Sequence, residues 1–171
     1  SKVTAGPRKA DKKVVVKKTT TSTTNKTSGT TPPPAPAAAK IDMAISSANF
    51  NVHYDYDLTS NSYLRSEGGV AHSATVSEVD KTGAQLHPKV VVALVMPYSI
   101  VDSSGHSGYN TNGTGTAYIF QDGDVIVATW TKDGRSGQIT FKDAAGAEVK
   151  LNTGQVWLTL LGAANLATYS P

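Results

Sequence analysis

The 171-residue sequence contains no cysteine, which excludes disulfide bonds and thiolate metal sites. No stretch approaches the roughly 18 consecutive apolar residues of a membrane-spanning helix. No signal peptide is visible either, so any targeting segment would lie upstream of Ser1. Because envelope and cytosolic proteins can both lack cysteine, these absences do not decide the compartment.

Acidic residues are nearly absent from the first 40 positions. Residues 1–40 hold nine Lys or Arg and a single acid, Asp11, whereas residues 41–171 hold seven Lys or Arg and twelve acids. The net charge of +3 therefore combines a strongly basic leader with a mildly acidic remainder. The leader also has no aromatic residue, the side chain on which nucleic-acid bases stack. Nucleic-acid binding through the leader is thus a weak alternative.

Thr, Ser, Pro, Ala and Lys dominate residues 1–40, where the valines at 14–16 form the one apolar run. Such a segment buries too little surface to offset its ordering entropy, and the prolines at 32–34 favour an extended chain. The sequence predicts a flexible, basic, low-complexity linker over residues 1–40. The pairs Lys12-Lys13 and Lys17-Lys18 suit a solvated tether, and they leave open a contact with an anionic wall polymer.

From Ile41 onward, short alternating apolar runs are separated by Gly, Asn and Asp. This pattern predicts strands at residues 41–46, 50–56, 62–65, 90–97, 115–121, 124–130, 138–142, 148–151 and 156–161. Residues 73–80 and 163–167 are short helical candidates. We expect a mainly β domain over residues 41–162, an antiparallel sandwich or partly closed barrel with little helix. A terminal extension is expected over residues 163–171.

The stretch YIFQDGDVIVATW, residues 118–130, predicts a hairpin with a two-residue turn at Asp122-Gly123. The register set by that turn pairs apolar residues on both faces: Phe120 with Val125, Tyr118 with Val127, Ile119 with Ile126, and Ala117 with Ala128. We therefore expect a central hairpin covered on both sides, with Trp130 in the core. Because a one-residue slip would not expose a polar face, the turn must fix the register.

The four histidines, His53, His72, His87 and His106, follow no standard zinc spacing. A metal site of Asp102, His106 and His72 is a weak alternative, and otherwise we expect no metal and no cofactor. Asp, Ser and His also occur together in VDSSGHSG, residues 101–108. Catalytic triads are usually assembled from distant loops, so a polar loop is the simpler interpretation. We assign no catalytic residue, and the sequence favours a non-enzymatic protein.

Tyr63, Arg65 and His72 are the candidate binding residues. Arg65 supplies a planar, permanently charged guanidinium suited to a carboxylate or phosphate. With an aromatic ring and an imidazole beside it, it would form an anion-binding or glycan-binding patch. The alternative is structural, with Arg65 paired to an acid such as Glu67 or Asp57.

GTGTAYIFQDGDVIVATWTK and TFKDAAGAEVKLNTGQVWLTL resemble the C-terminal domain of the YerB-like lipoprotein family of bacteria. Their matching residues are Gly113, Gly115, Phe120, Asp122, Gly123, Thr129, Trp130, Phe141, Asp143, Gly146, Leu151, Gly154 and Trp157. Upstream matches are Tyr56, Asp57, Tyr63, Arg65, Gly69 and His72. One departure is that the family often has an acid soon after the histidine, whereas Ser73 to Thr75 follow here. Most matches are turn glycines and core aromatics, which identify a fold rather than a site.

The resemblance implies an extracytoplasmic protein, anchored to the bacterial cell membrane by an upstream lipidated cysteine. It also implies an N-terminal domain upstream of this chain. The expected function is to bind a partner or wall component, or to support that N-terminal domain, without catalysis. A cell-wall hydrolase with a site shared between the two domains is the alternative. The expected partners are the N-terminal domain or an envelope component, and the membrane is reached only through the lipid anchor.

Overall fold

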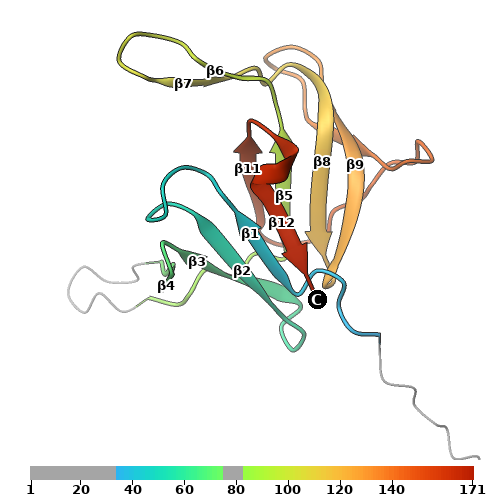
Figure 1. The fold of residues 1–171 in the computed structure, drawn as a ribbon. Helices are drawn as coiled ribbons and strands as arrows, with labels where there is room; N and C mark the ends of the chain where they lie inside the picture. Colours follow the sequence, from blue (N-terminus) through green and yellow to red (C-terminus); the bar gives the residue numbers. More distant parts are fainter. Residues whose placement is uncertain (1–33, 75–82) are drawn as a thin grey trace, which may run out of the picture. The chain divides into compact units, whose positions relative to one another are not determined.

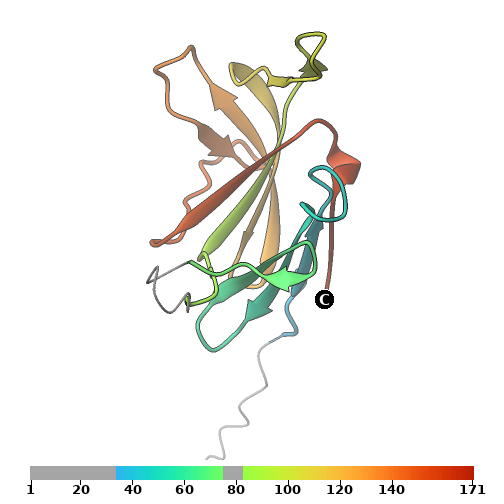
Figure 2. The ribbon, with the colours of Figure 1, turned by 90° about the vertical axis from the view of Figure 1, so that its left-hand side faces the viewer.

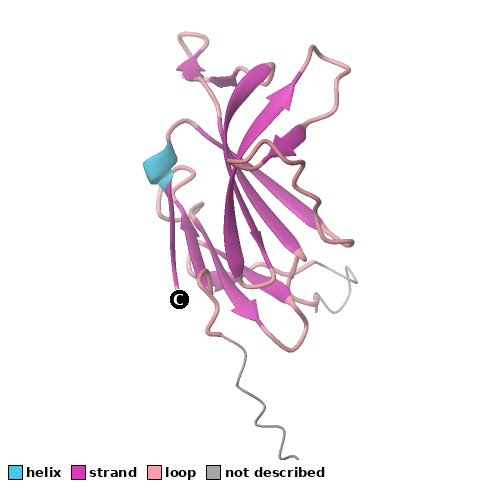
Figure 3. Ribbon diagram, turned by 90° about the vertical axis from the view of Figure 1, so that its right-hand side faces the viewer, coloured by secondary structure: helices cyan, strands magenta, loops and turns pink. Residues whose placement is uncertain are grey.

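A computed structural model describes residues 34–74 and 83–171, which belong to one compact unit. The linker prediction for residues 1–33 and most of the helical candidate at 73–80 lie outside the described residues. The described part is built from strands arranged in two five-stranded sheets and one two-stranded sheet (Figure 1). Its one helical element is a short 3-10 turn (Figure 3). The prediction of a mainly β domain is confirmed, and the sheets do not close into a barrel.

The first sheet, called sheet A here, is antiparallel with the order β12-β1-β2-β3-β4. Its strands are β1 (Lys40–Met43), β2 (Val52–Asp57), β3 (Ser62–Glu67), β4 (Val70–Ala71) and β12 (Ala167–Ser170). Buried and exposed side chains alternate along its strands, as expected for a sheet with one buried face. Its buried side chains include Ile41, Met43, Val52, Tyr54 and Tyr63.

The second sheet, called sheet B, has the order β10-β9-β8-β5-β11. Its strands are β5 (Val90–Val95), β8 (Gly113–Gln121), β9 (Asp124–Lys132), β10 (Thr140–Lys142) and β11 (Val156–Leu161). β11 pairs with β5 in parallel, and the other pairs are antiparallel. β5 has the apolar sequence VVVALV, and its first five residues are buried. A continuous apolar run is typical of a strand that is covered on both faces.

Two apolar clusters cover the two faces of sheet B. In one cluster, Val91, Ala93 and Phe120 of sheet B pack with Ile41 and Tyr54 of sheet A. The other cluster lies on the opposite face, where Phe141 of β10 packs with Ile139, Val149 and Leu151 from the chain on either side of β10. Figure 2 shows sheet A packed against one side of sheet B.

The predicted hairpin is confirmed as β8 and β9, with every predicted pair in register. Asp122 has φ 58° and Gly123 has φ 75°, as a two-residue turn of type I′ requires. β8 is covered on both sides, since Ile119 and Phe120 point to opposite faces and are both fully buried. β9 is less covered than predicted, because Val127 is 52% exposed.

A third, two-stranded sheet consists of β6 (Tyr98–Ile100) and β7 (Ser107–Tyr109). Figure 1 shows that it extends away from sheet B, and we call residues 97–110 the β6–β7 arm. The sequence pattern predicted that the preceding strand ends at residue 97 and that a loop follows it. Strands of three residues containing Ser and Gly are too short to show an alternating pattern.

Some expected elements also differ in kind from the prediction. The strand expected at residues 148–151 is reduced to an isolated bridge between Lys142 and Glu148. Residues 163–167 contain the 3-10 turn η1 (Ala164–Leu166) instead of a longer helix. Residues 163–171, expected as an extension, also contain β12, which pairs with β1 along its whole length.

The turn between β8 and β9 attaches sheet B to sheet A. The backbone N–H of Gly123 donates to Oη of Tyr63 at 3.1 Å. The carboxylate Oδ1 of Asp122 accepts one hydrogen bond from Asn61 and one from Asn152, each at 2.7 Å. One turn therefore holds the loop between β2 and β3 and the loop before β11.

We expect Gly123→Ala to destabilise the domain strongly. The new Cβ would lie 2.6 Å from Cε1 of Tyr56 and 2.9 Å from Cβ of Pro36. A left-handed conformation costs a non-glycine residue roughly 1–2 kcal/mol, and overpacking adds roughly 1–3 kcal/mol. Gly134→Ala is the matched control, because Gly134 has φ 66° and no atom within 4 Å of the added carbon. Equal losses of unfolding free energy in urea would contradict the proposed contact.

Candidate functional site

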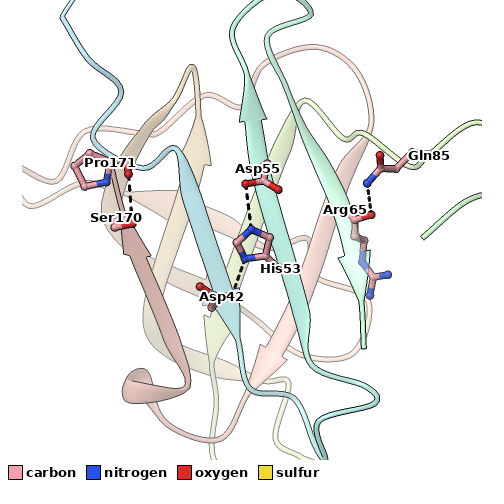
Figure 4. A network of polar contacts seen from close by, with 7 residues as sticks. All are labelled: Asp42, His53, Asp55, Arg65, Gln85, Ser170 and Pro171. Atoms are coloured by element: carbon pink, nitrogen blue, oxygen red, sulfur yellow. Dashed lines mark hydrogen bonds and ion pairs between the residues drawn. The ribbon is translucent and has the colours of Figure 1, made fainter. Parts of the chain in front are cut away.

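The Arg65 side chain lies in the interior, between sheet A and β11. It is 5% exposed, and its guanidinium carbon lies 4.5 Å from the ring centroid of Trp157. This geometry is a cation–π contact, which is strongest when both groups are shielded from water. Gln85 donates a hydrogen bond to the Arg65 carbonyl at 2.9 Å, and Figure 4 shows this pair. Arg65 therefore joins the two sheets.

Glu67 and His72 share one nitrogen of the Arg65 guanidinium. Nη1 donates to Oε2 of Glu67 at 2.8 Å and to Nδ1 of His72. Nδ1 of His72 also lies 3.4 Å from Oε2 of Glu67, so the three side chains form one cluster. His72 also packs edge-on against Trp157, with 6.1 Å between ring centroids. The structural alternative, Arg65 paired with Glu67, is the arrangement that the structure has.

Tyr63 does not share this cluster. Its side chain is fully buried, and its hydroxyl accepts the Gly123 hydrogen bond at the β8–β9 turn. Burial raises the pKa of Tyr63 far above its ordinary value. Its ring packs against Tyr56 at a centroid distance of 5.2 Å. Tyr63 therefore bonds to the turn, and the structure does not bring its hydroxyl together with the Arg65 and His72 side chains.

Beside the cluster lies a hollow of about 290 Å³, lined by Asn49, Glu67, Val70, Ala71 and His72. Glu67 and His72 are about one-third exposed there, so they are the solvent-facing groups of the cluster. Beneath them, Nε of Arg65 and the hydroxyl of Tyr54 are buried without a hydrogen-bond partner within the described part of the chain. An incoming anion would meet Glu67 and His72 before the buried guanidinium. The anion-binding role of Arg65 stays a prediction.

The structure does not bring Asp102, His106 and His72, the residues of the alternative metal site, together. Asp102 and His106 lie on the β6–β7 arm, where Nδ1 of His106 is 2.5 Å from Oδ2 of Asp102. This contact, first among several hydrogen bonds, lowers the pKa of Asp102. His72 instead contacts Arg65. Across residues 34–74 and 83–171, no group of three or more His, Cys, Asp and Glu is placed to hold a metal ion.

Figure 4 shows a polar group that the sequence analysis did not assemble, on the outer face of sheet A. Nδ1 of His53 lies 2.7 Å from Oδ1 of Asp42, and Nε2 lies 3.1 Å from Oδ1 of Asp55. Burial opposes protonation of the ring, but hydrogen bonds and charge from both carboxylates outweigh it and raise the pKa of His53. With a carboxylate at each nitrogen, the doubly protonated imidazolium fits this site.

The His53 group should make stability depend on pH. A histidine with a raised folded-state pKa stabilises the fold below its unfolded-state value of about 6.5, and this contribution disappears as pH rises through the folded-state pKa. We expect His53→Gln to lower the unfolding free energy by about 0.2–1 kcal/mol at pH 5.5, as for exposed ion pairs. At pH 9 the variant and wild type should agree. A difference that is the same at both pH values in urea titrations would contradict this assignment.

In the Arg65 cluster, we expect Glu67→Ala to lower the unfolding free energy more than Arg65→Met does. Glu67→Ala leaves a buried guanidinium without its carboxylate, a change that costs roughly 3 kcal/mol. Arg65→Met keeps apolar contact with Trp157 and leaves Glu67, which is 34% exposed, open to hydration. We expect Arg65→Met to lower the unfolding free energy by about 1 kcal/mol, as for volume-conserving core changes. Urea unfolding of both variants checks the order, and the reverse order would contradict the burial argument.

Comparison with known proteins identifies the family of this chain. The profile of the C-terminal domain of DUF3048, a protein family of unknown function, matches residues 41–158. The chain therefore belongs to this family, as the turn and core motifs predicted.

One solved structure resembles it, that of the YerB protein from Bacillus subtilis, with a TM-score of 0.65 and 20% sequence identity. The match covers 81% of this chain and 46% of the YerB chain, so this chain spans less than half of that relative. At this identity the likeness establishes the fold alone. A search of curated proteins found no match. None of the described residues forms a helix long and apolar enough to cross a membrane.

Proposed function

We propose that this chain is a non-catalytic binding domain of an extracytoplasmic, lipid-anchored bacterial protein. Its partner is the N-terminal domain of the same polypeptide, and the binding surface is the β6–β7 arm. The extracytoplasmic location and the lipid anchor rest on the resemblance to the YerB-like lipoprotein family. The binding surface rests on the exposed apolar side chains of the arm.

Tyr98 and Ile100 lie on one face of the arm, and Val101 lies on the other. Tyr98 is 46% exposed, Ile100 is 54% exposed and Val101 is 61% exposed. Ile45, at 40% exposure, lies across a groove from Tyr98. Scattered apolar residues are normal on a surface, but a contiguous group marks an interaction site. An isolated two-stranded hairpin is also marginally stable in water, so the arm would gain stability from a partner that covers it.

The base of the arm forms a groove of about 360 Å³. It is lined by Ala44, Ile45, Ser46, Tyr98, Ser107, Tyr109, Gly162 and Leu166. Tyr98 and Tyr109 stack beside it with 5.2 Å between ring centroids. Gly162 permits the close approach of the Tyr98 side chain to the backbone after β11, because a Cβ at residue 162 would lie 3.0 Å from Cβ of Tyr98.

The choice of partner follows from chain length and domain type. The matching profile is that of a C-terminal domain, and the chain spans 46% of the YerB structure. A domain on the same polypeptide has an effective concentration in the millimolar range for a short flexible linker. A modest apolar surface therefore suffices for intramolecular docking, whereas a separate partner would need higher intrinsic affinity.

The direct test is calorimetric titration of this chain with the separately produced N-terminal domain of its full-length polypeptide. We expect the double variant Ile100→Ser and Val101→Ser to weaken binding at least about tenfold, because it removes one exposed apolar side chain from each face of the arm. Val127→Ser is the matched control, since Val127 is 52% exposed but lies on β9. Parallel titrations use peptidoglycan and teichoic acid. Binding to a wall polymer alone, or equal binding by both variants, would contradict the proposal.

A further inference from the structure

We infer that the partner binds the arm as an added β-strand, pairing through its backbone with the outer edge of β6. This inference rests on the proposed function and specifies how the partner binds. It commits to an extended segment of the N-terminal domain, with apolar side chains at alternate positions.

The hydrogen-bond pattern shows which backbone groups of β6 face outward. The N–H of Val101 donates to the His106 carbonyl at 2.9 Å, and the N–H of Asn110 donates to the Pro97 carbonyl at 3.0 Å. Antiparallel pairs alternate between hydrogen-bonded and non-bonded types. Since Val101 and Pro97 are bonded positions, Ser99 is the bonded position between them.

Tyr98 and Ile100 are consequently the non-bonded positions of β6. Their pairs are Tyr109 and Ser107, and their own N–H and C=O groups point away from β7. None of the hydrogen bonds found within residues 34–74 and 83–171 uses the N–H of Tyr98 or Ile100. β6 therefore offers two outward backbone donors, spaced as a pairing strand requires.

The edge of β6 also lacks the features that usually prevent strand addition. Proteins protect exposed edges with charged residues, prolines or bulges. From Tyr98 to Val101 the sequence is YSIV, without charge or proline. Pro97 precedes it, but its missing N–H faces Asn110 and leaves the outer edge unaffected. The charged groups at the tip, Asp102 and His106, pair with each other.

The groove explains the side-chain preference of the added strand. Tyr98, Ser107 and Tyr109 lie on one face of the arm, and all three line the groove. A strand added beside β6 directs alternate side chains toward that face. One apolar side chain would then enter the groove, whose far wall includes Ile45 and Leu166. Main-chain bonds supply affinity and the groove supplies selectivity, as in other cases of strand addition.

Amide hydrogen exchange measured residue by residue by NMR tests the inference, with the separately produced N-terminal domain as probe. We expect the amides of Tyr98 and Ile100 to exchange fast in the free chain and at least about tenfold more slowly in the complex. The amides of Ser99 and Val101 bond within the arm and should change little. This alternation distinguishes strand addition from simple covering of the arm. Uniform protection, or none at Tyr98 and Ile100, would overturn the inference.

Two variants at one position separate backbone from side chain. Ile100→Pro removes the outward N–H and leaves the bonds at Ser99 and Val101 in place. Ile100→Ala keeps the N–H and removes the side chain. We expect the proline variant to bind about tenfold more weakly than the alanine variant, the loss expected for backbone hydrogen bonding. If Ile100→Pro disrupts the arm, the amide-exchange pattern of the wild type still decides whether the partner binds as an added strand.

The remaining outcomes are also decisive. If the N-terminal domain binds and both Ile100 variants bind it equally, strand addition is wrong while docking on the arm stands. If the wild type does not bind the N-terminal domain, the proposed function and this inference both fail. A concentration-dependent dimer of this chain that protects Tyr98 and Ile100 would show that a second copy occupies the edge, which overturns the proposed occupant.

Discussion

The attachment of the β8–β9 turn to sheet A is the constraint on which the rest of the structure depends. Asp122 and Gly123 adopt left-handed conformations that give the hairpin its register. The same turn bonds to Tyr63, and the Gly123 carbonyl accepts from the N–H of Ala38 at 2.9 Å. Moving the turn would therefore disturb the hairpin, the sheet interface and the entry of the chain into the domain together.

The Arg65 cluster is the second connection between the sheets. Its guanidinium contacts Trp157 on one side and Glu67 on the other. A buried charge is tolerated only when it is paired, so the three side chains act as a unit. Many residues that identify the family belong to these two connections. This accounts for a motif set that defines a fold clearly, while the proposed binding surface lies elsewhere.

The sequence predicted the parts of the fold that depend on local rules. An Asp-Gly pair between apolar strands determines turn type and register within a few residues, and the structure agrees pair by pair. The sequence also offered Glu67 and Asp57 as partners of Arg65, and the structure pairs Arg65 with Glu67, two residues along β3. The contact with Trp157 could not be predicted, since it depends on how β11 packs beside sheet A.

The β6–β7 arm was missed for a different reason. Its strands are three residues each, and its Gly and Ser residues are typical of loops. The exposed Tyr98 and Ile100 were a usable signal, because apolar residues in a polar loop need an explanation. Sequence could not show that they gather on one hairpin above a groove, which requires the position of Ile45 and Gly162 in space.

Photo-crosslinking in the full-length polypeptide tests the central claim most directly. A photoreactive residue replaces Ile100 on the arm in one protein and Leu58 in another. Both positions are more than half exposed, and Leu58 follows β2, away from the arm. The account predicts crosslinks from position 100 to the N-terminal domain and none from position 58. Equal crosslinking from both positions, or crosslinks from position 100 only to other molecules, would contradict it.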